Sequence, residues 1–220
     1  MVQVKICGIN SAGAADAAVV AGGADYAGLV FFSGSPRHVM PEQAASLAAR
    51  LRGRCRIVAV VVDAADPDIE LAVRAVRPDL LQLHGRETPD RIVAIRQRFG
   101  LPVIKAIAVA DAGDLARTTA YESVADMLLF DTKALGETHR PGGHGVPFDW
   151  QLLRGRKFVR PWLLAGGLTA ENVARAIRAC GAPGVDCSSG VETSRGAKNP
   201  QLICEFIAAA RAAQFAGTDA

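Results

Sequence analysis

Eight short apolar runs alternate with eight helix-like stretches along the 220 residues, and this alternation limits the possible folds more than any other feature. The runs are rich in Val, Leu and Ile, which is typical of parallel strands covered on both faces. The predicted strands are 3–7, 26–31, 57–63, 80–84, 103–107, 127–131, 162–166 and 184–188, and the predicted helices are 11–22, 41–52, 67–77, 89–99, 111–120, 149–154, 170–180 and 199–213. Eight β–α units in one chain predict a single-domain (β/α)8 TIM barrel of the α/β class, with a doubly wound open sheet as the alternative.

No linker, low-complexity block or charge run divides the chain. It is therefore predicted to form one barrel domain over residues 1–213, with a flexible tail over 214–220. Half of the residues are apolar and 21% are charged, which is enough apolar material for a core. The net charge of +3 comes from scattered Lys and Arg residues, which argues against a nucleic-acid-binding surface and suits a small anionic metabolite.

The chain enters its first predicted strand directly, without the pattern of a signal peptide. No apolar run approaches the roughly 20 residues that span a bilayer, so no membrane partner is expected. The cysteines are widely spaced without a C-x-x-C pair, which predicts free thiols and a cytoplasmic location; they are Cys7, Cys55, Cys180, Cys187 and Cys204, of which the last four are interpreted as structural. The histidines show no short ligand spacing, so no metal site is predicted; they are His38, His84, His139 and His144.

Two residues with acid–base chemistry follow apolar strands. Cys7 closes the first predicted strand just before Gly8, and Asp131 closes the sixth. Taken singly, a thiol at a strand end is more often a small buried apolar group, and an aspartate there is often a helix cap. Together they predict a base and an acid for proton transfer at the mouth of a parallel barrel.

Glycines and hydroxyls follow the seventh and eighth predicted strands. The seventh ends in Gly166 and Gly167, and the eighth leads into Ser188, Ser189 and Gly190. Paired glycines let backbone N–H groups approach an anion closely, and these two loops commonly form a phosphate site in barrels. A phosphate-binding site is predicted here. The connections 32–40 and 132–147 are longer than the others and are predicted to cover a ligand.

Polar residues interrupt the otherwise apolar strands, and burial requires that they be paired or face the wet mouth of the barrel; they are Lys5, Gln82, His84, Lys105, Asp131 and Asp186. Residues two apart share a strand face, so Lys5 lies beneath Cys7 and Gln82 beneath His84. The eighth strand neighbours the first in a barrel, so a Lys5–Asp186 pair is predicted, with Lys5 favouring the Cys7 thiolate. For His84, a supporting role in the site and a purely structural one stay open.

Taken in order, the motifs of this chain are Lys5-Ile6-Cys7-Gly8-Ile9, Ser35-Pro36-Arg37, Gln82-Leu83-His84-Gly85, Phe130-Asp131-Thr132-Lys133, Gly142-Gly143-x-Gly145, Phe148-Asp149-Trp150, Ala165-Gly166-Gly167-Leu168 and Val185-Asp186-x-Ser188-Ser189-Gly190-Val191-Glu192. From residue 3 to about residue 210, the chain resembles phosphoribosylanthranilate isomerase of tryptophan biosynthesis. The resemblance implies a (β/α)8 barrel that carries out a cofactor-free Amadori rearrangement. Its substrate would be N-(5-phosphoribosyl)anthranilate and its product 1-(2-carboxyphenylamino)-1-deoxyribulose 5-phosphate.

The resemblance also implies roles for single residues. Asp131 would be the general acid that protonates the furanose ring oxygen, and Cys7 the general base that removes the C2′ proton. Arg37 would bind the anthranilate carboxylate, for which a guanidinium fork is well suited. The glycine and serine loops would hold the phosphate. The partner is then a small phosphorylated substrate, and the assembly is expected to be a monomer or a homodimer.

Three positions depart from the family pattern. Asn10 replaces a Thr and is expected to cap the first helix in its place. His144 stands in the glycine-rich loop where a small hydroxyl residue is more usual, which puts a side-chain contact from this position in doubt. Cys187 replaces a Val and is expected on the outward strand face, without a catalytic role.

Three other functions compete with this one. Another sugar-phosphate aminoaldose–aminoketose isomerase would be expected to show paired aspartates and a second phosphate site, and no second phosphate loop is recognised in the first half of the chain. Indole-glycerol-phosphate synthase normally needs a Lys and Glu ensemble and a longer N-terminal extension. A non-catalytic phosphate-binding barrel would not need Cys7, Asp131 and Arg37 together.

Overall fold

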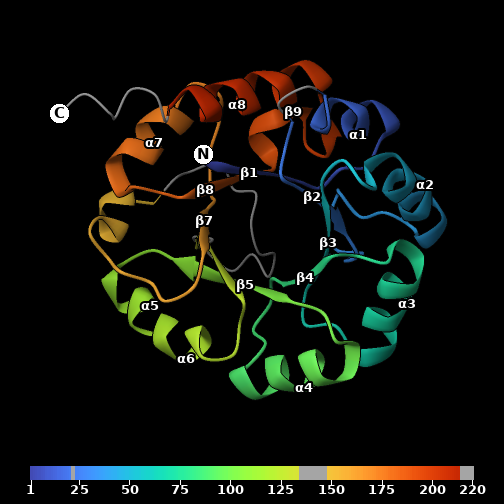
Figure 1. Ribbon diagram of the computed structural model, residues 1–220, viewed down its shortest axis with the longest axis horizontal. Coiled ribbons are helices and arrows are strands. Elements are labelled where there is room, and N and C mark those ends of the chain that lie inside the picture. The colour runs from blue at the N-terminus through green and yellow to red at the C-terminus, as the bar shows by residue number, and fades with distance from the viewer. Residues whose placement is uncertain (21–22, 134–147, 214–220) are drawn as a thin grey trace.

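The computed structural model describes residues 1–20, 23–133 and 148–213. Eight parallel strands close into a barrel in the order β1 to β8, with a ring of helices outside them, as Figure 1 shows. The strands are β1 (Gln3–Cys7), β2 (Tyr26–Val30), β3 (Arg56–Val61), β4 (Leu80–Leu83), β5 (Val103–Val109), β6 (Met127–Thr132), β7 (Trp162–Leu164) and β8 (Gly184–Cys187). The predicted (β/α)8 TIM barrel is confirmed, and the open sheet is excluded by the pairing of β1 with β8.

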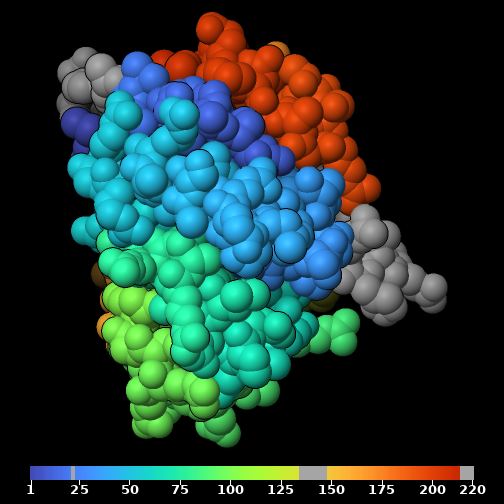
Figure 2. All heavy atoms as spheres, turned by 90° about the vertical axis from the view of Figure 1, so that its right-hand side faces the viewer, coloured from blue at the N-terminus to red at the C-terminus, as the bar shows by residue number. Residues whose placement is uncertain are grey.

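The helices cover the outside of the barrel. They are α1 (Ala12–Ala18), α2 (Pro41–Leu51), α3 (Asp66–Val76), α4 (Pro89–Phe99), α5 (Ala112–Ala116), α6 (Thr118–Glu122), α7 (Val173–Cys180) and α8 (Pro200–Ala212). Figure 2 shows α1 to α4 stacked in chain order, from blue to green, down one side of the molecule. No helix in the described residues is long and apolar enough to cross a bilayer.

The apolar core has two layers, because successive side chains of a strand point to opposite faces. Val58, Val60, Ile104, Leu129 and Leu163 belong to the cluster inside the barrel. Their strand neighbours, among them Ile57, Ala59, Val103, Leu128 and Leu164, pack in the larger cluster between the barrel and the helices. The strands are thus buried on both faces, which explains their continuous apolar runs.

Three parts of the second half differ from the sequence prediction. The stretch 111–120 forms two short helices, α5 and α6, and the stretch 149–154 forms only the 3₁₀ turn η1 (Trp150–Leu153), after which Gly155 turns the chain with a φ of +71°. After β8, the turn η2 (Ser189–Val191) leads into two short antiparallel strands that were not predicted, β9 (Glu192–Ser194) and β10 (Ala197–Lys198). The tail 214–220 and the glycine-rich loop with Gly142, Gly143, His144 and Gly145 lie outside the described residues.

Candidate active site

A cavity opens at the carboxyl ends of the barrel strands. In (β/α)8 barrels this face carries the active site. Most of the predicted site residues line the cavity, namely Cys7, Arg37, His84, Asp131, Gly166, Gly167, Asp186, Ser188 and Ser189. Lys5 and Gln82 lie beneath it and are fully buried, and Gly190 packs against Leu168 of the first loop.

The floor beneath Cys7 is an ion pair between neighbouring strands. Lys5 on β1 is in register with Asp186 on β8, and Lys5 Nζ donates to Asp186 Oδ1 at 2.8 Å. The predicted pair is therefore present, and both side chains are nearly fully buried. On the other side, a side chain at Gly28 of β2 would place its Cβ 3.1 Å from Cys7 Sγ and 3.3 Å from Lys5 Nζ. Glycine at this position leaves room for the thiol and the ammonium to lie side by side.

Burial governs the acidity of the Cys7 thiol. It raises the pKa of Cys7, while the positive charge of Lys5 acts in the opposite direction and only partly offsets it. Burial also lowers the pKa of Lys5, but the attraction of Asp186 and Cys7 outweighs it, so the pKa of Lys5 is raised and the ammonium form persists. The expectation that Lys5 favours the thiolate is right in direction. The net pKa of Cys7 nevertheless stays above its ordinary value.

A chain of polar side chains leads to Asp131 at the end of β6. Gln82 Nε2 lies 3.0 Å from His84 Nδ1, and His84 Nε2 lies 3.2 Å from Asp131 Oδ2. An amide nitrogen can only donate, so Nδ1 accepts here, and Nε2 is the ring nitrogen that faces the carboxyl group. The other carboxyl oxygen, Oδ1, accepts the backbone N–H of Thr132 at 2.8 Å. His84 and Gln82 thus hold the orientation of Asp131, which favours the supporting role for His84.

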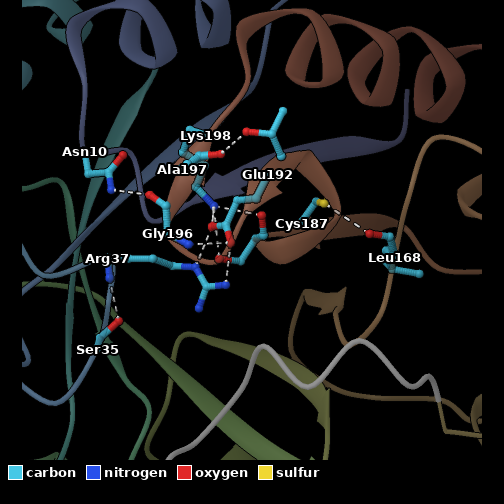
Figure 3. Close-up of polar contacts among 11 residues, drawn as sticks. Asn10, Ser35, Arg37, Leu168, Cys187, Glu192, Gly196, Ala197 and Lys198 are labelled. Atoms are coloured by element: carbon cyan, nitrogen blue, oxygen red, sulfur yellow. Dashed lines mark hydrogen bonds and ion pairs between the residues drawn. The ribbon is translucent and has the colours of Figure 1, made fainter.

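Arg37 reaches the cavity from the connection after β2. Its stem lies directly on the backbone of Gly8, where a Cβ would come within 2.6 Å of Arg37 Cδ and where φ is +78°. Arg37 Nε donates to Glu192 Oε1 at 2.6 Å, and Nη2 donates to Glu192 Oε2 at 2.8 Å. Figure 3 shows the guanidinium held by Glu192 on one side, with Nη1 pointing away from it. One edge of the fork is occupied, and within the described residues Nη1 on the other edge has no hydrogen bond.

The two predicted phosphate loops touch each other through their backbones. A Cβ at Gly190 would lie 1.9 Å from the Leu168 carbonyl oxygen, and one at Gly166 would lie 2.2 Å from Thr132 Oγ1. Gly166 has a φ of +90°, so a side chain there would also strain the backbone. Cys187 Sγ donates to the same Leu168 carbonyl at 3.2 Å, and it packs in the outer core layer, as expected. The loops after β7 and β8 therefore form one surface.

The sequence of the whole barrel matches one family. A profile of N-(5'phosphoribosyl)anthranilate (PRA) isomerase matches residues 4–209. The chain belongs to this family. A PRA isomerase from Rhodopseudomonas palustris (strain BisA53) is 53% identical over 212 residues, which cover 96% of this chain and 97% of that protein.

Solved PRA isomerase structures share the fold. The one from Thermotoga maritima has a TM-score of 0.85 and 36% identity, covering 96% of this chain and all of that one. A second PRA isomerase structure, with a TM-score of 0.82 and 35% identity, covers the same shares of the two chains. That protein is in complex with reduced 1-(o-carboxyphenylamino)-1-deoxyribulose 5-phosphate.

Two charged residues beside the site have no role that could be predicted from the sequence. Glu192 stands within a motif that does not reveal its partner, and Lys198 lies outside the motifs. Burial would raise the pKa of Glu192, but hydrogen bonds and charges from Arg37 and Lys198 outweigh it and lower the pKa to about 2. No periodicity could reveal Lys198, since it ends a strand of two residues. Its pairing with Glu192 depends on a turn that the sequence pattern does not specify.

The expectation for Asn10 is wrong. Ser11, not Asn10, is the N-cap of α1, and its Oγ accepts the backbone N–H of Ala14 at 3.3 Å. Asn10 Nδ2 instead donates to the Gly196 carbonyl at 2.7 Å, in the segment after β8. The replacement of the family's Thr by Asn10 therefore affects the segment after β8 and not the start of α1.

Proposed function

We propose that this chain catalyses the Amadori rearrangement of N-(5-phosphoribosyl)anthranilate to 1-(2-carboxyphenylamino)-1-deoxyribulose 5-phosphate, without a cofactor. The observation that carries the proposal is the shared cavity: Cys7 and Asp131 line the same hollow as Arg37 and the two glycine and serine loops. Membership of the PRA isomerase family supports it, as does the reduced 5-phosphate ligand in the complex of the solved relative. One cavity thus offers groups for both anionic ends of the substrate and for both proton transfers.

In the first step, Asp131 gives a proton to the furanose ring oxygen. The C1′–O bond breaks, and the lone pair of the anthranilate nitrogen forms the C=N bond of a protonated Schiff base. Asp131 must carry a proton at this moment and must point at the ring oxygen. The contacts of its two oxygens with Thr132 and His84 fix that direction.

In the second step, Cys7 as thiolate removes the proton from C2′. The electrons of the C–H bond form a C1′=C2′ bond and neutralise the nitrogen, which gives an enolamine. Tautomerisation then moves the O2′ proton to C1′ and leaves the ketone. Lys5 is close enough to stabilise the thiolate, and it is itself held by Asp186.

Binding groups at both ends of the substrate hold it between Asp131 and Cys7. The free edge of Arg37 would take the anthranilate carboxylate through two parallel N–H bonds. Gly166 and Gly167 line the cavity with backbone alone, and Ser188 and Ser189 add hydroxyls, which together suit a phosphate.

The test is direct turnover by the wild-type protein. The fluorescence of freshly generated N-(5-phosphoribosyl)anthranilate should fall much faster with the protein than in its absence. Well-folded protein that leaves the decay unchanged would refute the proposal. In that case, binding of inorganic phosphate would favour a non-catalytic barrel, and turnover of another aminoaldose phosphate would favour a different isomerase.

We also propose a cytoplasmic location, which the five free thiols support. A monomer or a homodimer remains our expectation for the assembly, and light scattering at micromolar concentration distinguishes the two.

The pH dependence of kcat/KM should report the Cys7–Lys5 contact. Cys7 must lose its proton to act, so kcat/KM should rise with pH along an ascending limb. Because the pKa of Cys7 is raised, this limb should lie at higher pH than for an ordinary thiol. Lys5 lowers that pKa more than Asp186 raises it, so the double variant Lys5→Met/Asp186→Asn should still move the limb to higher pH. Each unit of displacement lowers the rate on the limb about tenfold.

A matched control removes a different buried ion pair. Lys105 Nζ contacts Glu87 Oε2 at 2.7 Å, and both side chains are almost fully buried. The variant Lys105→Met/Glu87→Gln should lose stability without moving the limb. An unchanged limb in the Lys5→Met/Asp186→Asn variant would show that the Lys5–Asp186 pair does not tune Cys7.

A further inference from the structure

After the second phosphate loop the chain forms a strap, residues 192–198, made of β9, a turn and β10, which lies at the rim of the barrel beside α1 in Figure 1. Gly196 forms the turn with a φ of +85°, and a Cβ there would lie 2.8 Å from the Pro36 carbonyl oxygen. Asn10 Nδ2 donates to the carbonyl of Gly196. The strap therefore lies against the connection that carries Arg37 and is hydrogen-bonded to the loop after β1, the strand that ends in Cys7.

The strap supplies the carboxylate that orients Arg37. A guanidinium has two edges that can bind a carboxylate with two hydrogen bonds, Nε with Nη2 and Nη1 with Nη2. Glu192 takes the first edge, at 2.6 and 2.8 Å, and its side chain is 3% exposed. In Figure 3, Nη1 points away from Glu192. Because the group is planar and one edge is fixed, the direction of the other edge is fixed as well.

Lys198 connects the same carboxylate to the phosphate side of the cavity. Its Nζ contacts Glu192 Oε1 at 2.7 Å, the Ser188 carbonyl at 2.7 Å and Ser188 Oγ at 3.2 Å. The Lys198 side chain has no exposed surface. Ser188 is the first residue of the second phosphate loop, so Glu192 is shared between the fork of Arg37 and a lysine that holds that loop.

We propose that Glu192 is a positioning residue, which together with Lys198 sets the free edge of Arg37 at a fixed separation from the phosphate loops. The inference rests on the proposed function, in which one substrate carries a carboxylate at one end and a phosphate at the other. Without the carboxylate, the two cations of Arg37 and Lys198 would repel each other, and the fork would lose its fixed direction. Holding both ends at once places the ribose between Asp131 and Cys7.

The variant Glu192→Gln keeps the shape of the side chain and removes its charge. It should raise the KM for N-(5-phosphoribosyl)anthranilate by about 10- to 100-fold, because this is the range for losing a hydrogen bond to a charged group. The change in kcat should be smaller. The matched control is Glu205→Gln on the exposed side of α8, where the carboxylate accepts from Gln201. That variant should leave both constants unchanged, and an unchanged KM in Glu192→Gln would overturn the proposal.

Two further measurements separate positioning from simple loss of fold. The double variant Glu192→Gln/Lys198→Met removes both charges of the buried pair, so it should fold where the single variant fails and should still show the raised KM. A melting curve and circular dichroism report whether each variant is folded. A folded double variant with wild-type KM would overturn the proposal.

The NMR resonance of the Arg37 Nε–H group gives a readout that needs no turnover. In the wild type this proton should exchange slowly with water, and addition of inorganic phosphate should shift its resonance through Lys198 and Glu192. Both effects should vanish in the double variant. A protected Nε–H that persists in the variant would overturn the positioning role, whereas a wild type with the NMR signature but without turnover would refute only the proposed reaction.

Discussion

Replacing Cys7 with Ala is expected to lower kcat by about 10²–10⁴-fold, the typical contribution of a positioned base. The thiolate is the group that takes the C2′ proton in the proposed mechanism, and Ala offers no base. The variant should bind substrate nearly normally, because Arg37 and the phosphate loops are untouched. Steady-state fluorescence measurements at saturating substrate give kcat directly.

The control for Cys7→Ala is Cys55→Ala. Cys55 is a free, half-buried thiol that lines a separate hollow with Asp25 and Arg54, and burial raises its pKa to about 11. Its loss should leave kcat unchanged, which excludes a general effect of removing a thiol. If folded Cys7→Ala protein kept kcat within tenfold of the wild type, another group would have to be the base.

Replacing Asp131 with Asn is expected to reduce kcat and kcat/KM together, again by about 10²–10⁴-fold. An amide has nearly the same shape and can still accept the N–H of Thr132, but it cannot deliver a proton to the ring oxygen. Ring opening then becomes the slow step. The same assay measures both constants.

Asp149→Asn is the matched control for the acid. Asp149 is exposed and caps η1 by accepting the N–H of Gln151 at 3.0 Å, a role that Asn fills equally well. That variant should have wild-type kinetics. A rise in KM alone in Asp131→Asn would reassign Asp131 from proton transfer to substrate binding.

The barrel could be predicted from the sequence because its strands are buried on both faces and thus appear as continuous apolar runs. The Lys5–Asp186 pair could also be predicted, since strand order and the alternation of side chains together specify it. The predicted helix 149–154 was wrong, because an apolar composition does not separate a helix from the 3₁₀ turn η1, after which Gly155 turns the chain.

The contact between Arg37 and Glu192 could not be predicted from the sequence. Its partner Glu192 lies 155 residues away and reaches it only because Gly8 admits the stem of Arg37 and Gly196 turns the strap. Local patterns carry no information about such a contact. The predicted role of Asn10 as a cap failed for the same reason, since its hydrogen bond goes to Gly196.

The contact between Gly190 and Leu168 limits how this barrel can be redesigned. The obstacle to a side chain at position 190 is a backbone carbonyl 1.9 Å away, which no change of rotamer can move. Transplanting the loop after β8 from another barrel would therefore press on the loop after β7 wherever the donor lacks glycine at this position. The two loops have to be exchanged as a cassette, so a new specificity for the phosphorylated end would arise by paired changes and not by single substitutions.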